Sequence, residues 1–341
     1  MRVAPDALNS AARELTVNPT VAESLRVAAR TLAGHSDSPR LDAELLLCQV
    51  LNLPRSGLIV HGTDPLSAAS RAAYDNLLAQ RLQGEPIAYL TGTREFWSLA
   101  LTVTRDVLVP RPETELLVEQ ALARLSPDRA HTVLDLGTGS GAIALALAAE
   151  RPLARIVGVD VSAPALAVAQ HNARKLELTQ IDWRLGSWFD AVPGERFDLI
   201  VSNPPYVAAA DPALRRLSAE PLLALAPGPT GLEALSAIVA RAAEHLHPHG
   251  WLLLEHGNAQ APDVTRLLEQ HGFGHVRSYP DYAGQPRVTL GAVESTHSRS
   301  SASHSSASHS SASRSSDSHL PRFRSLSSHS LRLHSSHQEI T

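Results

Sequence analysis

From about His131 onward, strand-like and helix-like stretches alternate along the chain. This order predicts a parallel sheet with helices on both faces, and thus an α/β fold. The expected strands are Thr132 to Leu136, Ile156 to Asp160, Ile181 to Leu185, Phe197 to Ser202 and Trp251 to Glu255. The expected helices are Ala142 to Glu150 and Pro164 to Leu176. Two further strands between Val276 and Leu290 are close enough in sequence to form an antiparallel edge pair.

The segment before this region has a helical pattern. From Val21 to about Gly92, apolar residues recur three and four positions apart, and prolines separate the stretches. This pattern predicts a small helical bundle over residues 21–92, whose apolar side chains pack as a core.

Residues 93–115 are expected to link the two regions. Apolar residues alternate from Phe96 to Val103 and again from Val107 to Val109, which predicts short strands that form a hairpin. The stretch from Pro110 to Glu115 then starts a helix, with Thr114 or a neighbour as its N-cap.

Composition limits the possible functions. The 341 residues carry a formal net charge of -4, which gives no electrostatic argument for tight binding to nucleic acid. No apolar run reaches roughly 18 residues and the N-terminus lacks an apolar signal core, so no membrane partner is expected. The single cysteine, Cys48, fits a reducing cytoplasm. We therefore expect a cytoplasmic protein, and take it to be a monomer.

The two ends of the chain differ from the rest. Residues 1–20 have weak periodicity and are expected to form a flexible extension. Residues 293–341 consist largely of Ser, His, Ala and Arg, and cannot bury enough apolar surface to fold, so a disordered tail is predicted. No metal is assigned to it, because no cysteine or acidic cluster accompanies the histidines.

A glycine-rich loop follows the first expected strand, with the sequence DLGTGSG from Asp135 to Gly141. Its glycines stand at alternate positions, where they let the backbone approach a ligand closely. The spacing is G-x-G-x-G and not the G-x-G-x-x-G of dinucleotide sites. Asp160 ends the next strand, where a carboxylate can accept both hydroxyls of a ribose. Trp188 follows the third strand, where it either flanks an adenine or belongs to the core.

The fourth strand ends at Ser202 and is followed by Asn203, Pro204, Pro205 and Tyr206. Because proline has no N–H for a sheet ladder and restricts the residue before it, the loop is stiff. Open α/β folds place their ligands at this edge of the sheet. An amide beside a backbone carbonyl and an aromatic ring can bind a planar NH2 group. The motif alone does not distinguish an adenine from an amide.

Taken together, these motifs resemble those of the bacterial glutamine methyltransferases that modify peptide chain release factors, the HemK/PrmC family. The resemblance covers about Val21 to Gly291. It is carried by GEPIAYLTG at 84–92, REFW at 94–97, PRPETE at 110–115, DLGTGSG at 135–141, SNPPY at 202–206 and LEHG at 254–257. It implies a seven-stranded Rossmann-like methyltransferase domain over residues 116–292, preceded by a substrate-docking helical domain and a hairpin linker.

The resemblance also implies the reaction. A methyl group passes from S-adenosyl-L-methionine to the side-chain amide nitrogen of a glutamine, the glutamine of the GGQ motif in class I release factors. The implied cofactor-binding residues are Gly137, Thr138, Gly139, Ser140, Gly141, Asp160, Trp188 and Asn203. The implied substrate-binding residues are Asn203, Pro204, Pro205 and Tyr206, of which Asn203, Pro204 and Tyr206 are catalytic. Ser187 departs from the family, which often has an aspartate there that accepts from the adenine amino group.

Three alternatives stay open. An adenine N6 methyltransferase of nucleic acid also presents NPPY to a planar NH2, but it should carry a basic face or a target-recognition domain. A glutamine methyltransferase of a ribosomal protein is related, and the PRPETE segment favours the release-factor branch over it. A binding module that kept the fold and lost catalysis is disfavoured by the intact glycine loop, Asp160 and NPPY.

Overall fold

The computed structural model describes residues 19–294. The extension expected over 1–20 and the tail expected over 293–341 lie almost wholly outside these residues. Within the described range, no helix is long and apolar enough to cross a membrane.

The helical pattern near the N-terminus forms helices, as predicted. They are α2 (Val21–Leu32), α3 (Pro39–Leu51), α4 (Arg55–Val60), α5 (Ala68–Leu82) and α6 (Ile87–Thr91). The first begins with a capping box, in which the Thr20 hydroxyl accepts from the Glu23 N–H and the Glu23 carboxylate accepts from the Thr20 N–H. Leucines of α2, α3 and α5 form a shared core with Tyr74, whose hydroxyl donates to the Ala43 carbonyl.

A hairpin follows, but it differs from the predicted one. Its strands are β1 (Thr93–Phe96) and β2 (Leu99–Thr102), joined by Trp97 and Ser98 at positive φ. The strand predicted over Val107 to Val109 is wrong. Val107 and Val109 bury their side chains against Ala165 and Val168, and the Val109 N–H donates to a side chain instead of a strand.

The PRPETE segment forms a 3-10 turn, η1 (Pro112–Thr114), followed by helix α7 (Glu115–Leu122). Thr114 occupies the N-cap position of α7, as predicted, but it has helical φ and ψ and its side chain makes no cap hydrogen bond. Glu115 in the first turn accepts from the Trp97 N–H at 2.9 Å, so this carboxylate ties the hairpin turn to α7.

The remaining elements build one seven-stranded sheet in the order β5-β4-β3-β6-β7-β9-β8. The strands are β3 (Thr132–Leu136), β4 (Arg155–Asp160), β5 (Ile181–Leu185), β6 (Phe197–Ser202), β7 (Leu246–Glu255), β8 (Phe273–Pro280) and β9 (Pro286–Val293). The first five are parallel, and β9 pairs antiparallel with both β7 and β8. The α/β class and the antiparallel pair are confirmed.

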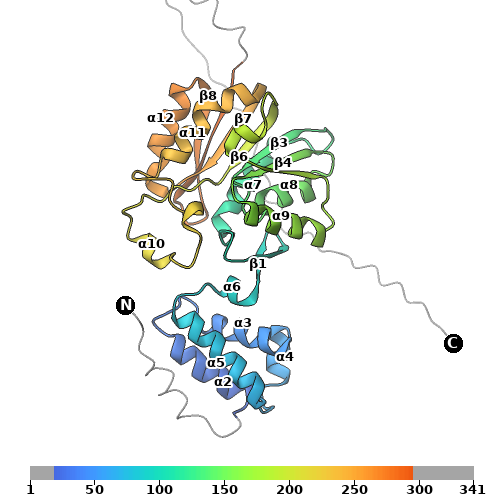
Figure 1. Cartoon of the computed structure of the whole chain (residues 1–341), viewed down its shortest axis with the longest axis vertical. Coiled ribbons are helices and arrows are strands. Elements are labelled where there is room, and N and C mark those ends of the chain that lie inside the picture. Colours follow the sequence, from blue (N-terminus) through green and yellow to red (C-terminus); the bar gives the residue numbers. More distant parts are fainter. Residues whose placement is uncertain (1–18, 295–341) are drawn as a thin grey trace, which may run out of the picture. The chain divides into compact units, whose positions relative to one another are not determined.

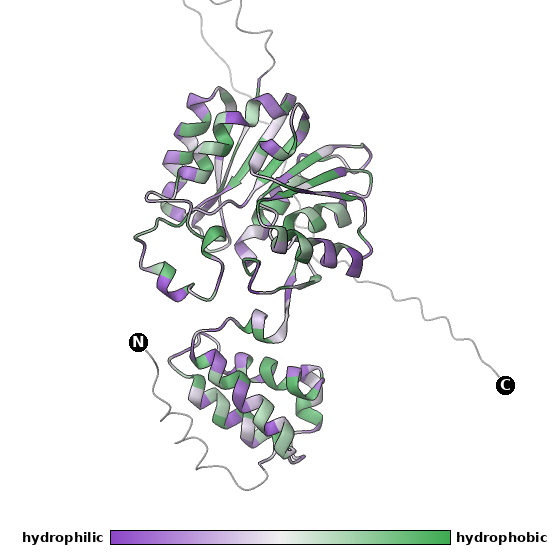
Figure 2. Cartoon of the chain, in the orientation of Figure 1, coloured by the Kyte–Doolittle hydropathy of each residue, from purple (hydrophilic) through white to green (hydrophobic). Residues whose placement is uncertain are grey.

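Helices cover both faces of this sheet (Figure 1). Helices α7, α8 (Ala142–Glu150) and α9 (Ala163–Lys175) lie on one face, and α11 (Glu233–Ala242) and α12 (Ala261–Gln270) lie on the other. Successive strand residues alternate between the two cores, as Val133 and Leu134 do. The strands buried between the helices are accordingly mostly apolar, as the green colour in Figure 2 shows.

One position in the sheet has no room for a side chain. A Cβ added to Gly158 on β4 would lie 2.5 Å from the Trp183 ring on β5. The indole therefore uses the space that this glycine leaves.

We predict that Gly158→Ala destabilises the protein by about 1–3 kcal/mol, because the added methyl overpacks against a large ring. Denaturant unfolding measures the change. When Trp183→Leu is already present, Gly158→Ala should cause little further loss of the free energy of unfolding. An equal cost of Gly158→Ala with either residue at position 183 would contradict this explanation.

Candidate active site

A cavity of about 490 Å³ opens at the carboxyl edge of the parallel strands. The loops that follow β3, β4, β5 and β6 contribute to its lining. The strand order reverses between β3 and β6, and open α/β sheets bind ligands in the crevice at such a point. The cavity also has the size typical of small-molecule sites.

The glycine-rich loop forms the floor of this cavity. Gly137, Gly139 and Gly141 all have positive φ, which explains why no side chain is found at these positions. Gly137 and Gly139 line the cavity, whereas Gly141 does not. A Cβ at Gly141 would lie 2.9 Å from the Trp183 ring, so this glycine permits close packing at the start of α8.

Asp160 at the end of β4 both faces the cavity and holds the loop. Its carboxylate accepts from the Gly139 N–H at 2.8 Å and from the Ser162 N–H at 2.9 Å. Burial raises its pKa, and the N–H donors around it oppose the shift. The predicted sugar-binding carboxylate is therefore also a structural clamp between the glycine loop and α9.

Asp135 lies beneath the glycine loop and is fully buried. Its carboxylate accepts from the Thr138 hydroxyl at 2.6 Å. Burial raises the pKa of Asp135 to about 7, although the Thr138 hydroxyl and the Ala144 N–H favour the charged form.

Ser187 and Trp188 line the cavity from the loop after β5. The half-buried Trp188 ring lies over Gly137, since a Cβ added there would be 3.5 Å from its Cζ3 atom. Trp188 thus serves both as a cavity wall and as a contact of the core on the α11 side. The sequence left these two roles open.

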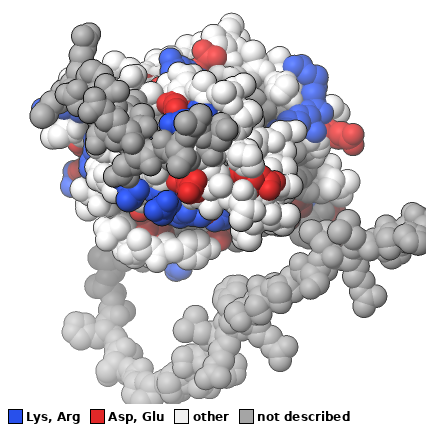
Figure 3. All heavy atoms as spheres, turned by 90° about the horizontal axis from the view of Figure 1, so that it is seen from below, with Lys and Arg blue, Asp and Glu red and all other residues white. Residues whose placement is uncertain are grey.

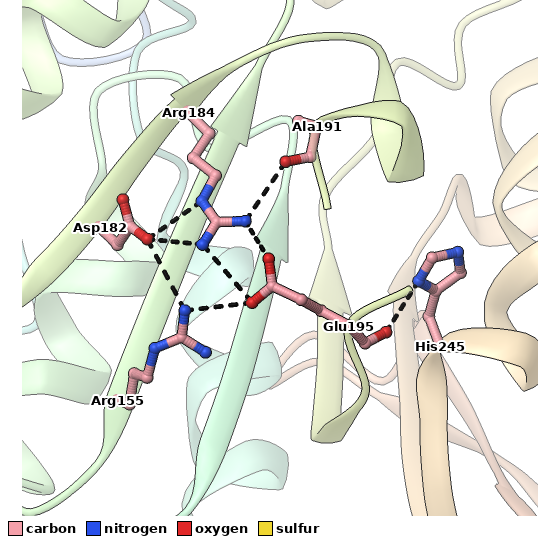
Figure 4. A network of polar contacts seen from close by, with 6 residues as sticks. All are labelled: Arg155, Asp182, Arg184, Ala191, Glu195 and His245. Atoms are coloured by element: carbon pink, nitrogen blue, oxygen red, sulfur yellow. Dashed lines mark hydrogen bonds and ion pairs between the residues drawn. The ribbon is translucent and has the colours of Figure 1, made fainter. Parts of the chain in front are cut away.

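An ion-pair network holds this loop from outside (Figure 4). Arg184 pairs with Asp182 at 2.7 Å and with Glu195, and it also donates to the Ala191 carbonyl at 3.3 Å. Arg155 on β4 pairs with the same Glu195 at 3.1 Å. The network therefore fastens Ala191 and Glu195, in the part of the loop after Trp188, to β4 and β5.

The NPPY loop directly follows β6. The Asn203 amide Nδ2 donates to the Thr114 hydroxyl at 3.1 Å, which leaves its Oδ1 as an acceptor on the other side. Asn203 and Pro205 line the cavity, whereas Pro204 and Tyr206 do not. Pro204 is buried, and the Tyr206 hydroxyl donates to Glu255 at 3.2 Å. The Tyr206 carbonyl also accepts from Gln260 at 3.0 Å, so this tyrosine anchors the loop.

The segment after NPPY forms a further wall of the cavity, which the sequence did not reveal. Pro221 and Leu223 line the cavity, and the Leu223 side chain is exposed at its edge. Buried Glu220 accepts from the Val109 N–H at 3.1 Å and pairs with Arg111. These bonds fasten the wall to the residues before α7.

Most of the predicted site residues thus meet around one cavity, and two buried polar residues beside them were missed. Both residues stand in motifs that carry the family resemblance, PRPETE and LEHG, but the sequence indicates no role for Thr114 beyond a helix cap and none for Glu255 beyond ending a strand. A signal for Glu255 existed, because an acidic residue ending an apolar parallel strand points to the ligand edge of the sheet.

Two family models match the chain. The PrmC N-terminal domain matches residues 23–92, and the methyltransferase small domain matches residues 112–228. With a seven-stranded sheet and a glycine loop at its carboxyl edge, the fold and the site define a Rossmann-like methyltransferase.

Similar proteins of known name show which family of methyltransferases the chain belongs to. The release factor glutamine methyltransferase of Xylella fastidiosa strain Temecula1 is 49% identical over 254 residues, which cover 74% of this chain and 92% of that protein. The enzyme of the same name from Yersinia pestis is 50% identical, with 75% and 93% covered, and that of Escherichia coli K12 is 45% identical, also with 75% and 93% covered. The chain belongs to the family of release factor glutamine methyltransferases.

We predict that Asp135→Asn stabilises the protein more at pH 8 than at pH 5. The folded pKa of Asp135 lies above that of an unfolded aspartate, near 3.9, so its contribution to stability is present below that value and is lost as pH rises through about 7. The asparagine does not titrate. Urea unfolding of both proteins at the two pH values tests this, and an unchanged difference between them would contradict it.

Proposed function

We propose that this protein transfers a methyl group from S-adenosyl-L-methionine to the side-chain amide nitrogen of a glutamine in peptide chain release factors. Family membership supports the activity. The observation that carries the chemistry is the Asn203 amide, whose nitrogen is held by Thr114 while its oxygen remains available at the cavity. The fastened NPPY loop keeps this acceptor in one orientation.

The cavity suits the proposed methyl donor. A Cβ added to Gly139 would meet nothing within 4 Å, so open space lies against the bare backbone of the loop. Trp188 offers a flat apolar wall for an adenine, and Asp160 offers a carboxylate for ribose hydroxyls. We propose that the residues from Gly137 to Ser140 bind the methionine end of S-adenosyl-L-methionine. Gly141 shapes the loop without facing the cavity.

S-adenosyl-L-methionine, when bound, supplies a methyl group activated by its sulfonium. The chain must overcome a different obstacle, because the lone pair of a glutamine amide nitrogen is delocalised into its carbonyl. We propose that Asn203 Oδ1 accepts one amide hydrogen, which aims the nitrogen and favours its pyramidal form. The Pro204 side chain lies outside the cavity lining, and we propose that its backbone carbonyl alone reaches the second amide hydrogen. Since the alkylated nitrogen is acidic, its proton leaves to solvent and no strong general base is required.

Tyr206 lies outside the cavity lining. The family resemblance implies that it contacts the substrate, but its hydroxyl reaches Glu255 instead. We propose that it supports the loop, and that Pro205 provides the apolar contact to the substrate.

Nucleic acid remains the less favoured acceptor. On the face shown in Figure 3, acidic and basic side chains of the described residues are interspersed among larger uncharged areas. A phosphate backbone would be attracted by a basic stripe. We propose that residues 21–92 dock the protein substrate and that the enzyme acts in the cytoplasm.

We predict that the purified protein transfers tritium from labelled S-adenosyl-L-methionine to release factor, and not to ribosomal protein or DNA incubated in parallel. Asn203→Ala should lower turnover roughly a hundredfold or more, because it removes an acceptor aimed at the reacting amide. Its cofactor affinity, measured by calorimetry, should stay nearly intact. Labelling of DNA or ribosomal protein alone would overturn the proposed substrate, and full activity of the variant would overturn the role of Asn203.

For Asp160→Ala, in contrast to Asn203→Ala, we predict that the main effect is on cofactor affinity. Losing a charged acceptor of the ribose hydroxyls should weaken cofactor affinity by about tenfold or more. Calorimetry measures this directly. The matched control is Asp263→Ala, which removes an exposed carboxylate at the start of α12 and should leave the affinity unchanged. Equal affinities of the two variants would contradict the assignment.

A further inference from the structure

A buried carboxyl lies behind the NPPY loop and has no place in the reaction described so far. Glu255 ends β7, and only 1% of its surface is exposed. Its Oε1 accepts from the Tyr206 hydroxyl. The Thr114 hydroxyl lies beside the same carboxyl and favours its charged form. A buried charge is costly unless hydrogen bonds or opposite charges compensate it.

Thr114 connects this carboxyl to Asn203. The threonine is buried, and its Oγ1 accepts from Asn203 Nδ2 at 3.1 Å. A hydroxyl has one hydrogen and two lone pairs, so the hydrogen of Thr114 is left for another acceptor. Glu255 Oε2 is buried and has no hydrogen-bond partner among the described residues, and a carboxylate can only accept.

We propose that Thr114 and Glu255 are positioning residues that fix the Asn203 amide with its oxygen toward the substrate. This inference rests on the proposed function. The ionised carboxylate takes the Thr114 hydrogen, so the lone pairs of Thr114 face Asn203 and accept its NH2 group. Glu255 thereby sets the direction of the hydrogen bonds that run through Thr114 to Asn203.

The opposite orientation of the amide would be unproductive. It would place Asn203 Oδ1 against the Thr114 lone pairs and turn the NH2 group toward the cavity. There it would meet the NH2 group of a substrate glutamine, donor against donor. Because a buried donor or acceptor without a partner costs about 1–3 kcal/mol, the correct orientation is strongly preferred while Glu255 is ionised.

The ionisation of Glu255 falls near neutral pH. Burial, together with a smaller effect of Glu113 of η1, raises its pKa to about 7, although the Thr114 and Tyr206 hydroxyls and Arg287 of β9 favour the charged form. A protonated carboxyl can donate, and it then no longer dictates the direction of the Thr114 hydroxyl. Turnover should therefore rise with pH through about 7.

Two variants of Thr114 test the proposal through turnover. Thr114→Val keeps the shape and loses the hydroxyl, so we expect kcat/KM toward release factor to fall about tenfold, the effect of about 1.4 kcal/mol. Thr114→Ser keeps the hydroxyl and should recover most of that loss. Cofactor affinity and the unfolding midpoint serve as controls. Equal turnover of the valine variant and the wild type would overturn the proposal, as would equal losses in both variants.

A measurement without catalysis separates this proposal from the proposed function. In protein labelled with 15N at asparagine, the side-chain NH2 signals of Asn203 are assigned with Asn203→Ala. These signals should be protected from solvent exchange in the wild type and in Thr114→Ser, and unprotected in Thr114→Val. If the wild type fails to methylate release factor, the proposed function falls while this result still decides the orientation. Equal exchange in all three proteins would overturn the positioning role.

Glu255→Gln provides an independent test should Thr114→Val fail to fold. The glutamine cannot ionise, so the rise of kcat near pH 7 should disappear from its pH profile. A profile identical in shape to that of the wild type would show that Glu255 does not control the amide.

Discussion

The parallel pairing of β3 with both β4 and β6 is the interaction on which the rest of the structure depends. Leu134 lies in register with Val157 on one side and with Ile200 on the other. Because the ladders are parallel, the strands all end at the same edge, and the loops that follow them converge there. The glycine loop, Asp160 and the NPPY loop are thus neighbours in space although long stretches of sequence separate them.

The same edge is also where the fold buries polar groups. Asp135 and Glu255 are both buried carboxyls with pKa values raised to about 7, and both stand at the carboxyl ends of parallel strands. Each is kept in place by hydroxyl donors, Thr138 for the first and Tyr206 for the second. An apolar side chain at either position would be easier to bury. The free-energy cost of burying these carboxyls therefore indicates that they are needed to hold the polar groups at this edge in place.

Much of the architecture could be predicted because local patterns decide it. Strands β3, β5 and β6 and helix α8 begin and end where their apolar runs and glycines indicate. The prediction failed where distant residues decide. Val107 to Val109 has the composition of a strand, but its partners are α9 and Glu220. Thr114 stands where a cap is expected, yet Asn203 uses its hydroxyl. Neither partner can be inferred from neighbours in sequence.

The site accordingly consists of two parts with different origins. The proposed cofactor side is local, since β3, β4 and the loop to Trp188 lie in one continuous stretch of chain. The proposed acceptor side joins Thr114, Asn203 and Glu255, which come from three separate stretches. Contacts between residues close in sequence form early in folding, and contacts between residues far apart in sequence form late. A chain emerging from the ribosome therefore acquires the parts for holding a methyl donor before β7 is made, and it can orient an acceptor only after that strand has joined the sheet.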